Sequence, residues 1–166
     1  MTPLQIAIER IQFSRKYTDR LLADLPTADW FRMPAEGITH IAWQVGHLAV
    51  AQYRLALVRL RGELPTDQSL MPTGFVEQFG KGSVAAPDPT QNPTIEEIRM
   101  VFENVHAQVL HEAPHFSESL LAETSLPRHS MFETKLGALA WCGNHEMVHA
   151  GQIALLRRLL GHNPLW

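Results

Sequence analysis

Apolar residues recur at helical spacing in four long stretches of the chain, and capping signals accompany them. Thr2 is a predicted N-cap, with Pro3 in the first turn and Gln5 as a capping-box partner. The predicted helices run from this cap to the residue before Pro26, from about Ile38 to Arg61, from Thr94 to Pro114, and from about Phe132 to Leu160. No stretch alternates apolar and polar residues as a strand does, so the fold class is predicted to be all-α, a helical bundle.

Two shorter segments follow the third predicted helix. Ser117 to Glu123 is predicted to add a short turn of helix, and Thr124 to Ser130, with Pro127, is predicted to be a loop. Neither segment carries a pattern that indicates chemistry.

The segment from Glu63 to Pro93 has no clear periodicity. It contains five prolines and is far longer than an ordinary connection in a compact domain. Its apolar residues, among them Met71, Phe75 and Phe79, are too many for a solvated linker. We therefore expect a packed segment that either covers a binding site or serves only as a crossover along the bundle.

The stretch from Asn144 to Gln152 carries the main chemical signal. His145 and His149 are four residues apart, so on a helix they share one face about 6 Å apart along the axis, close enough to bind one metal ion. His47, on the inward side of the second predicted helix, is the natural third ligand. Three neutral imidazoles would leave positions for water or substrate, as in a catalytic metal site. The alternative is that His47 is a hydrogen-bonded core histidine.

Glycines accompany all three histidines. Gly46 directly precedes His47, and a glycine inside a helix costs about 1 kcal/mol relative to alanine unless a neighbour must come close. Gly143 and Gly151 bracket the histidines of the last helix in the same manner. Close packing of a neighbouring element is therefore expected at each glycine.

The letters from His145 to His149 also satisfy the H-E-x-x-H pattern of zinc peptidases. In those enzymes the third ligand lies downstream, but no Asp or Glu follows His149, and Gly151 breaks the spacing of a third histidine. We therefore expect no peptidase activity, and we expect Glu146 to orient a ligand or to form a surface pair. Cys142 lies about 7 to 8 Å axially from the expected ion, so it is predicted to be a buried, unreactive thiol.

The composition limits the cellular compartments and the partners that suit this protein. A chain of 166 residues with 45% hydrophobic content suits a single domain over residues 1–166. A net charge of −3 without a basic block argues against nucleic acid as a partner. The single cysteine excludes an intramolecular disulfide, and no apolar run or N-terminal layout suggests a membrane span or a signal peptide, so we expect a cytoplasmic protein. Four further histidines are expected in surface or core roles: His106, His111, His115 and His129.

Two motifs together resemble a known family. The run from Ile41 to Leu48 (Ile-Ala-Trp-Gln-Val-Gly-His-Leu) and the run from His145 to Gln152 are similar to the DinB-like superfamily, which includes bacillithiol transferases and the metal-binding domain of mycothiol-dependent enzymes. The likeness continues to the final Pro164-Leu165-Trp166. It implies a four-helix bundle with an up-down-down-up course and a long crossover between helices two and three. It also implies a divalent ion, zinc or nickel, held by a histidine triad at His47, His145 and His149.

Three functions are compatible with such a site. The first is a thiol S-transferase, in which the ion activates a low-molecular-weight thiol toward a small-molecule substrate. The second is a hydrolase that uses a metal-activated water. The third is a binding or dimerisation module, a homodimer among the candidates, that keeps the ion and turns nothing over. We expect the segment from Glu63 to Pro93 to lie over the open face of the ion, with Phe75 and Phe79 as one wall of the pocket. The alternative is that the two rings only fill the outer groove between helices two and three.

Overall fold

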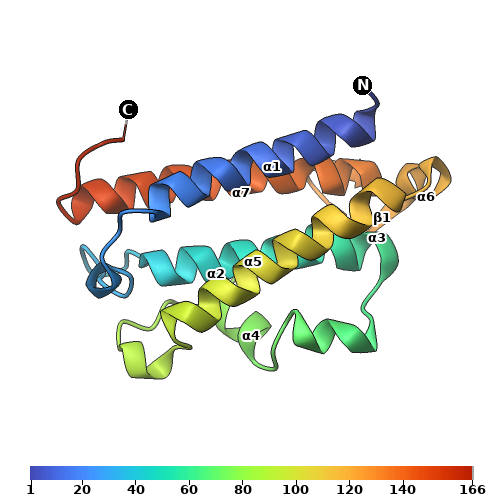
Figure 1. Ribbon diagram of the computed structural model, residues 1–166. Helices are drawn as coiled ribbons and strands as arrows, with labels where there is room; N and C mark the ends of the chain where they lie inside the picture. The colour runs from blue at the N-terminus through green and yellow to red at the C-terminus, as the bar shows by residue number, and fades with distance from the viewer. Residues whose placement is uncertain (166) are drawn as a thin grey trace.

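Four long helices form the body of the protein in the computed structural model, which describes residues 1–165. They are α1 (Pro3–Leu22), α2 (Ile41–Tyr53), α5 (Ile95–Glu112) and α7 (Lys135–Leu159). Helix α1 packs along α7, and α2 packs against both α5 and α7 (Figure 1). In Figure 1, α2 and α5 begin at the same end of the molecule, whereas α1 and α7 begin at the opposite end. Trp166, part of the C-terminal sequence in the resemblance, lies outside the described residues.

The helix ends follow the local signals of the sequence. The capping box of Thr2 with Gln5 begins α1, and that of Thr94 with Glu97 begins α5, both as predicted. Gly161 follows the end of α7 with a φ of 96°, which a residue with a side chain rarely adopts. Together with the four long helices, these ends confirm the mostly helical fold that the periodicity predicts.

The second predicted helix is confirmed as a continuous helical stretch, with two differences. It begins at Ile41 rather than Ile38, because Nδ1 of His40 accepts a hydrogen bond of 2.9 Å from the backbone N–H of Trp43 and caps the helix. After Tyr53 it passes into a π-helical segment, η2 (Arg54–Val58), and then into α3 (Arg59–Arg61). It ends at Arg61, as predicted, and is followed by Gly62, where φ is 82°.

The crossover from Glu63 to Pro93 is packed along α2 and contains three short helical turns: η3 (Pro65–Ser69), α4 (Phe75–Phe79) and η4 (Pro89–Gln91). Hydrogen bonds from four side chains of α2 and its cap reach it at successive points. These are His40 to Ala86 O (2.9 Å), Trp43 to Ser83 Oγ (2.9 Å), His47 to Phe79 O (2.8 Å) and Tyr53 to Asp67 (3.1 Å). The expectation of a packed segment is confirmed.

A small β-hairpin replaces the predicted loop before the last helix. After α6 (Glu118–Ala122), strand β1 (Thr124–His129) pairs antiparallel with β2 (Phe132–Thr134). The prediction that the last helix starts at Phe132 is therefore wrong: it starts at Lys135, after the N-cap Thr134. Arg59 holds the hairpin, because its Nη1 donates to Ser125 Oγ at 3.1 Å and to Pro127 O at 2.7 Å.

Further 3-10 turns lie in the remaining connections, η1 (Thr27–Asp29) before α2 and η5 (Ala113–His115) after α5. Trp30, beside η1, is 1% exposed, so the connector belongs to the core. None of the helices within residues 1–165 combines the length and the apolar character needed to cross a membrane.

Candidate metal centre

The three histidines singled out from the sequence come together between α2 and α7. One nitrogen from each of His47, His145 and His149 lies within 4.8 Å of the others. The ring centroid of His47 lies 5.3 Å from that of His145 and 4.6 Å from that of His149, and the centroids of His145 and His149 are 4.5 Å apart. Metal–nitrogen bonds of about 2.1 Å put two ligand atoms at most about 4.2 Å apart, so small ring rotations would bring the three nitrogens onto one ion.

Hydrogen bonds to oxygen atoms fix the protonation of two of these rings. Nδ1 of His47 lies 2.8 Å from the carbonyl oxygen of Phe79, and Nδ1 of His149 lies 2.6 Å from Oε1 of Gln44. A carbonyl oxygen only accepts, so each Nδ1 carries the hydrogen and each Nε2 keeps its lone pair. Gln44 is itself oriented, because its Nε2 donates to Oε1 of Gln152 at 2.9 Å. Metal-binding histidines in proteins are held in this way.

The surroundings keep the three imidazoles neutral. Burial lowers the pKa of His149 to about 3, with smaller contributions from His145 and His47. Burial, followed by the electrostatic influence of the neighbouring His47 and His129, lowers the pKa of His145 to about 4. Burial also lowers the pKa of His47, and the nearby Arg54 acts in the same direction. Neutral imidazole is the form that binds a metal ion, so the donor set suits a divalent cation at neutral pH.

Glu146 is bonded to an arginine of α1. Its side chain is buried in the bundle, and Oε1 accepts a hydrogen bond of 3.0 Å from Nε of Arg15 on α1. Arg15 also donates to Phe102 O at 3.0 Å and to Oε1 of Gln52 at 2.8 Å. The expected surface pair is therefore wrong, because the partner is an interior arginine. The second residue of the H-E-x-x-H pattern is held in this network and is not placed as a peptidase base.

The other sulfur and nitrogen donors lie outside the triad. Cys142 is buried, and burial together with the Glu146 charge raises the pKa of its thiol, as expected for an unreactive cysteine. His106 bonds to Gln52 at 3.1 Å, and His162 bonds to Asp29 at 2.8 Å. These side chains have structural roles.

Two of the three glycines permit close packing. A Cβ at Gly46 would lie 2.5 Å from the ring of Phe79, and a Cβ at Gly143 would lie 3.0 Å from the backbone of Arg10 on α1. The same expectation is wrong for Gly151, where a Cβ would meet nothing within 4 Å. Gly46 thus brings the crossover close enough for the Phe79 carbonyl to reach His47.

The crossover meets the site through its backbone at Phe79. The rings of Phe75 and Phe79 are 4.6 Å apart and buried, and that of Phe79 lies against Gly46. They belong to the hydrophobic core. Their expected role as a wall on the open face of an ion stays a prediction. The hydrogen bond between His47 and the Phe79 carbonyl could not be predicted from side-chain patterns, because it uses a backbone atom.

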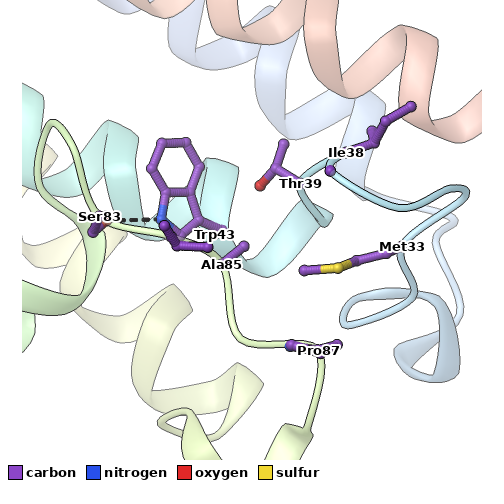
Figure 2. A pocket seen from close by; sticks show the side chains of 9 residues that line it. Met33, Ile38, Thr39, Trp43, Ser83, Ala85 and Pro87 are labelled. Carbon is purple, nitrogen blue, oxygen red and sulfur yellow. Dashed lines mark hydrogen bonds between the residues drawn. The ribbon is translucent and has the colours of Figure 1, made fainter.

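Trp43 lies between His47 and a cavity that none of the three histidines lines. The indole stacks on the ring of His47, with centroids 4.8 Å apart and an interplanar angle of 10°. The same indole lines a pocket of about 330 Å³ between the start of α2, the preceding connector and the crossover (Figure 2). Met33, Ile38 and Ala85 give it an apolar lining, and Ser83 holds the indole Nε1–H at 2.9 Å. No pattern in the sequence indicated this pocket.

Comparisons with known proteins agree with this architecture. The chain is similar to a solved structure described as the conserved protein of a locus from Enterococcus faecalis, with 21% sequence identity and a TM-score of 0.63. That likeness covers 96% of this chain and 97% of the other, and it shows a shared fold. No curated protein matches the chain.

A family model provides the assignment. The DinB superfamily model matches residues 10–153, a span that includes His47, His145 and His149. Because the match extends from α1 into the last helix, the chain belongs to the DinB superfamily.

Proposed function

We propose that this protein is a metal-dependent enzyme in which His47, His145 and His149 hold one divalent ion, zinc or nickel. The observation that carries the proposal is the pair of Nδ1 hydrogen bonds to Phe79 O and to Gln44, which leave an Nε2 lone pair free on His47 and on His149. A buried core histidine needs one partner, but here two rings are oriented and three ligand atoms converge.

The reaction we favour is transfer of a low-molecular-weight thiol to a small-molecule electrophile. A divalent ion bound by three imidazoles lowers the pKa of a coordinated thiol and so supplies a nucleophile at neutral pH. The chain's own residues hold and orient this centre: Gln44 and the Phe79 carbonyl fix the rings, and Trp43 packs on His47. The apolar pocket beside Trp43 offers a place for the substrate's apolar part. Membership of the DinB superfamily, which the sequence motifs link to thiol transferases, supports this choice.

Hydrolysis is the second candidate, and a binding or dimerisation module without turnover is the third. The position of Glu146 bears on hydrolysis, because a carboxylate that could assist an attacking water is instead bonded to Arg15. This arrangement favours a reaction whose nucleophile needs no protein base.

We also propose a domain organisation, a location and an oligomeric state. We propose a single domain over residues 1–166, built as a four-helix bundle with an up-down-down-up course. A cytoplasmic location and a homodimer complete the proposal. The directions of α1, α2, α5 and α7 in Figure 1 support the proposed course.

The proposal is tested in two steps. Elemental analysis of the purified protein should give one zinc or nickel ion per chain, and the metal-loaded protein should consume a model electrophile such as monochlorobimane only when a thiol is added. Turnover without thiol would favour the hydrolase. A full complement of metal with no turnover in either assay would favour the non-catalytic module.

A further inference from the structure

Gln152 of α7 lies about one helical turn beyond His149 and ends a chain of hydrogen bonds that begins at the metal centre. Nδ1 of His149 lies 2.6 Å from Oε1 of Gln44, and Nε2 of Gln44 donates to Oε1 of Gln152 at 2.9 Å. Gln44 is completely buried, whereas the Gln152 side chain is exposed. The chain of bonds therefore leads from a proposed metal ligand to a side chain at the protein surface.

The tautomer of His149 sets the direction of each bond in this chain. When Nε2 of His149 keeps its lone pair for an ion, Nδ1 carries the hydrogen and needs an acceptor, which is the Gln44 oxygen. The Gln44 nitrogen then faces Gln152, whose oxygen accepts its hydrogen bond. Nε2 of Gln152 makes no hydrogen bond within residues 1–165. In the tautomer that suits a metal ion, Gln152 therefore presents free N–H donors to solvent.

Gln152 belongs to the edge of α7 that also carries His145. Val148 and Gln152 follow His145 by three and seven residues, so the three side chains share one side of the helix. His145 is partly exposed, Val148 is 55% exposed, and Gln152 is exposed. A molecule that extends from His145 along this edge meets the apolar Val148 and then the amide of Gln152.

The apolar pocket beside Trp43 lies toward the same end of the site. Gln44, the partner of Gln152, directly follows Trp43 in α2, and both precede His47 by about one turn. The Trp43 indole stacks on His47 and lines the pocket (Figure 2). Gln152 thus supplies a polar contact at the end of the triad where Trp43 supplies an apolar one.

The spacing along α7 sets how far a bound molecule must reach. An ion shared by His145 and His149 would lie about 7 to 8 Å along the axis from Gln152. Side chains on a helix lean toward its N-terminus, so the Gln152 amide leans back toward His149. A metal–sulfur bond of about 2.3 Å and a hydrogen bond of about 2.9 Å cover most of this distance. An acceptor about three bonds from a metal-bound sulfur is therefore within reach of Gln152.

We propose that Gln152 is a specificity-determining residue whose Nε2–H donates a hydrogen bond to an acceptor oxygen of the small molecule bound at the metal centre. This inference rests on the proposed function and specifies its substrate as a thiol with an oxygen acceptor about three bonds from the sulfur. The oxygen of Gln152 is held by Gln44, so the free end of the amide selects an acceptor on the ligand.

The experiment compares two neutral thiols on cobalt-loaded protein. 2-Methoxyethanethiol carries an ether oxygen three bonds from the sulfur, and 1-butanethiol has a methylene group in its place. The cobalt–sulfur absorption band in the near ultraviolet reports the binding of each thiol. The preference for the ether over the alkane thiol is expected to be about three- to tenfold larger in the native protein than in a variant without the Gln152 donor, as one neutral hydrogen bond allows.

Two substitutions separate donation to the ligand from the bond to Gln44. Gln152→Glu keeps an oxygen that accepts from Gln44 but has no N–H, so it should still bind cobalt and should lose the preference for the ether. Gln152→Leu loses both contacts and should lose the preference as well. Both thiols have the same charge, so the effect of the added carboxylate cancels when their affinities are compared.

Gln12→Glu, at an exposed glutamine of α1, is the matched control and should keep the native preference. Circular dichroism verifies that each variant is folded, which is expected because both substituted side chains are exposed.

The outcomes separate the two proposals. The same preference in Gln152→Glu as in the native protein overturns the donor role of Gln152 and leaves the metal centre in place. Loss of cobalt binding in Gln152→Glu overturns the chain of hydrogen bonds from which the orientation of Gln152 is deduced. Absence of a cobalt–sulfur band with either thiol in the native protein overturns the thiol-transferase proposal, and the role of Gln152 falls with it.

Discussion

Gln44 accepts a hydrogen bond of 2.6 Å from Nδ1 of His149, so a glutamine of α2 fixes the orientation of a histidine of α7. The amide can do this in only one orientation, because its nitrogen donates to Gln152 at 2.9 Å. Gln44 is completely buried. This hydrogen bond connects the two helices that carry the proposed ligands. The orientation of the His149 ring therefore depends on how α2 packs against α7.

Replacing Gln44 by leucine should therefore weaken metal binding while all three histidines remain. Loss of a partner of this kind costs about 10- to 100-fold in metal affinity. Competition with a chromophoric zinc chelator measures the change. Gln12→Leu, at an exposed position of α1, is the control and should bind as the native protein does. An unchanged affinity in Gln44→Leu would show that His149 does not depend on this bond.

Each of the three histidines should be needed for a stable site. Substituting His47, His145 or His149 by alanine leaves two imidazoles, and we expect the affinity for zinc to fall by on the order of a hundredfold or more. Isothermal titration calorimetry on the apo proteins measures this. His111→Ala removes an exposed histidine and should leave binding unchanged. One equivalent of tightly bound metal in His47→Ala would rule out the triad.

Local features of the structure could be predicted from the sequence. The capping boxes at Thr2 and Thr94 depend on residues three positions apart, and such short-range rules hold whatever the rest of the chain does. The grouping of His145 and His149 follows in the same way from helix geometry. His47 could be predicted as the third member of the triad because the neighbouring Gly46 indicates close packing at this point of the helix.

Features that depend on packing between distant segments could not be predicted. The strands of the hairpin are short, and Pro127 within β1 argues against a strand, so their pairing appears only in three dimensions. The contact of Phe79 with His47 uses a backbone carbonyl, which has no signature in the sequence. The buried pair of Glu146 with Arg15 could not be predicted, because the two residues lie 131 positions apart in the sequence.

Gly46 on α2 and Gly151 on α7 should respond in opposite ways to substitution by alanine. A Cβ at Gly46 would lie 2.5 Å from a Phe79 ring that is fully buried, so Gly46→Ala should destabilise the fold by about 1 to 3 kcal/mol. A Cβ at Gly151 meets nothing, so Gly151→Ala should be neutral or stabilise by up to about 1 kcal/mol through helix propensity. Urea denaturation measures both. Equal effects would contradict the packing at Gly46.

Glu146 should matter for folding and not for metal stoichiometry. Glu146→Gln leaves the Arg15 guanidinium buried without its counter-charge, and we expect a loss of about 3 kcal/mol of unfolding free energy. The variant should still bind one metal ion per chain, and neither protein should cleave casein. The double variant Arg15→Met with Glu146→Leu should recover much of the stability, since neither charge remains buried. Proteolysis by the native protein that disappears in Glu146→Gln would revive the peptidase interpretation.

His106 should make the fold sensitive to acid. Burial, with a smaller contribution from the Arg15 charge, lowers its pKa from 6.5 to about 3 in the folded protein. Between these values the unfolded chain binds a proton that the folded protein does not, so stability falls as the pH drops from about 6.5 toward about 3. His106→Gln keeps an acceptor for the Gln52 amide, which lies 3.1 Å from Nδ1 of His106, but cannot be protonated.

The variant should therefore lose less unfolding free energy than the native protein between pH 7 and pH 4.5, by about 1 kcal/mol once the partial exposure of the ring is considered. Urea midpoints of the apo proteins at the two pH values give this difference. The titration of the triad histidines contributes equally to both proteins and cancels. His111→Gln, at an exposed position, should follow the native protein. If the two slopes with pH are the same in His106→Gln and in the native protein, His106 is not held neutral by its burial beside Arg15, and the acid sensitivity of the fold originates elsewhere.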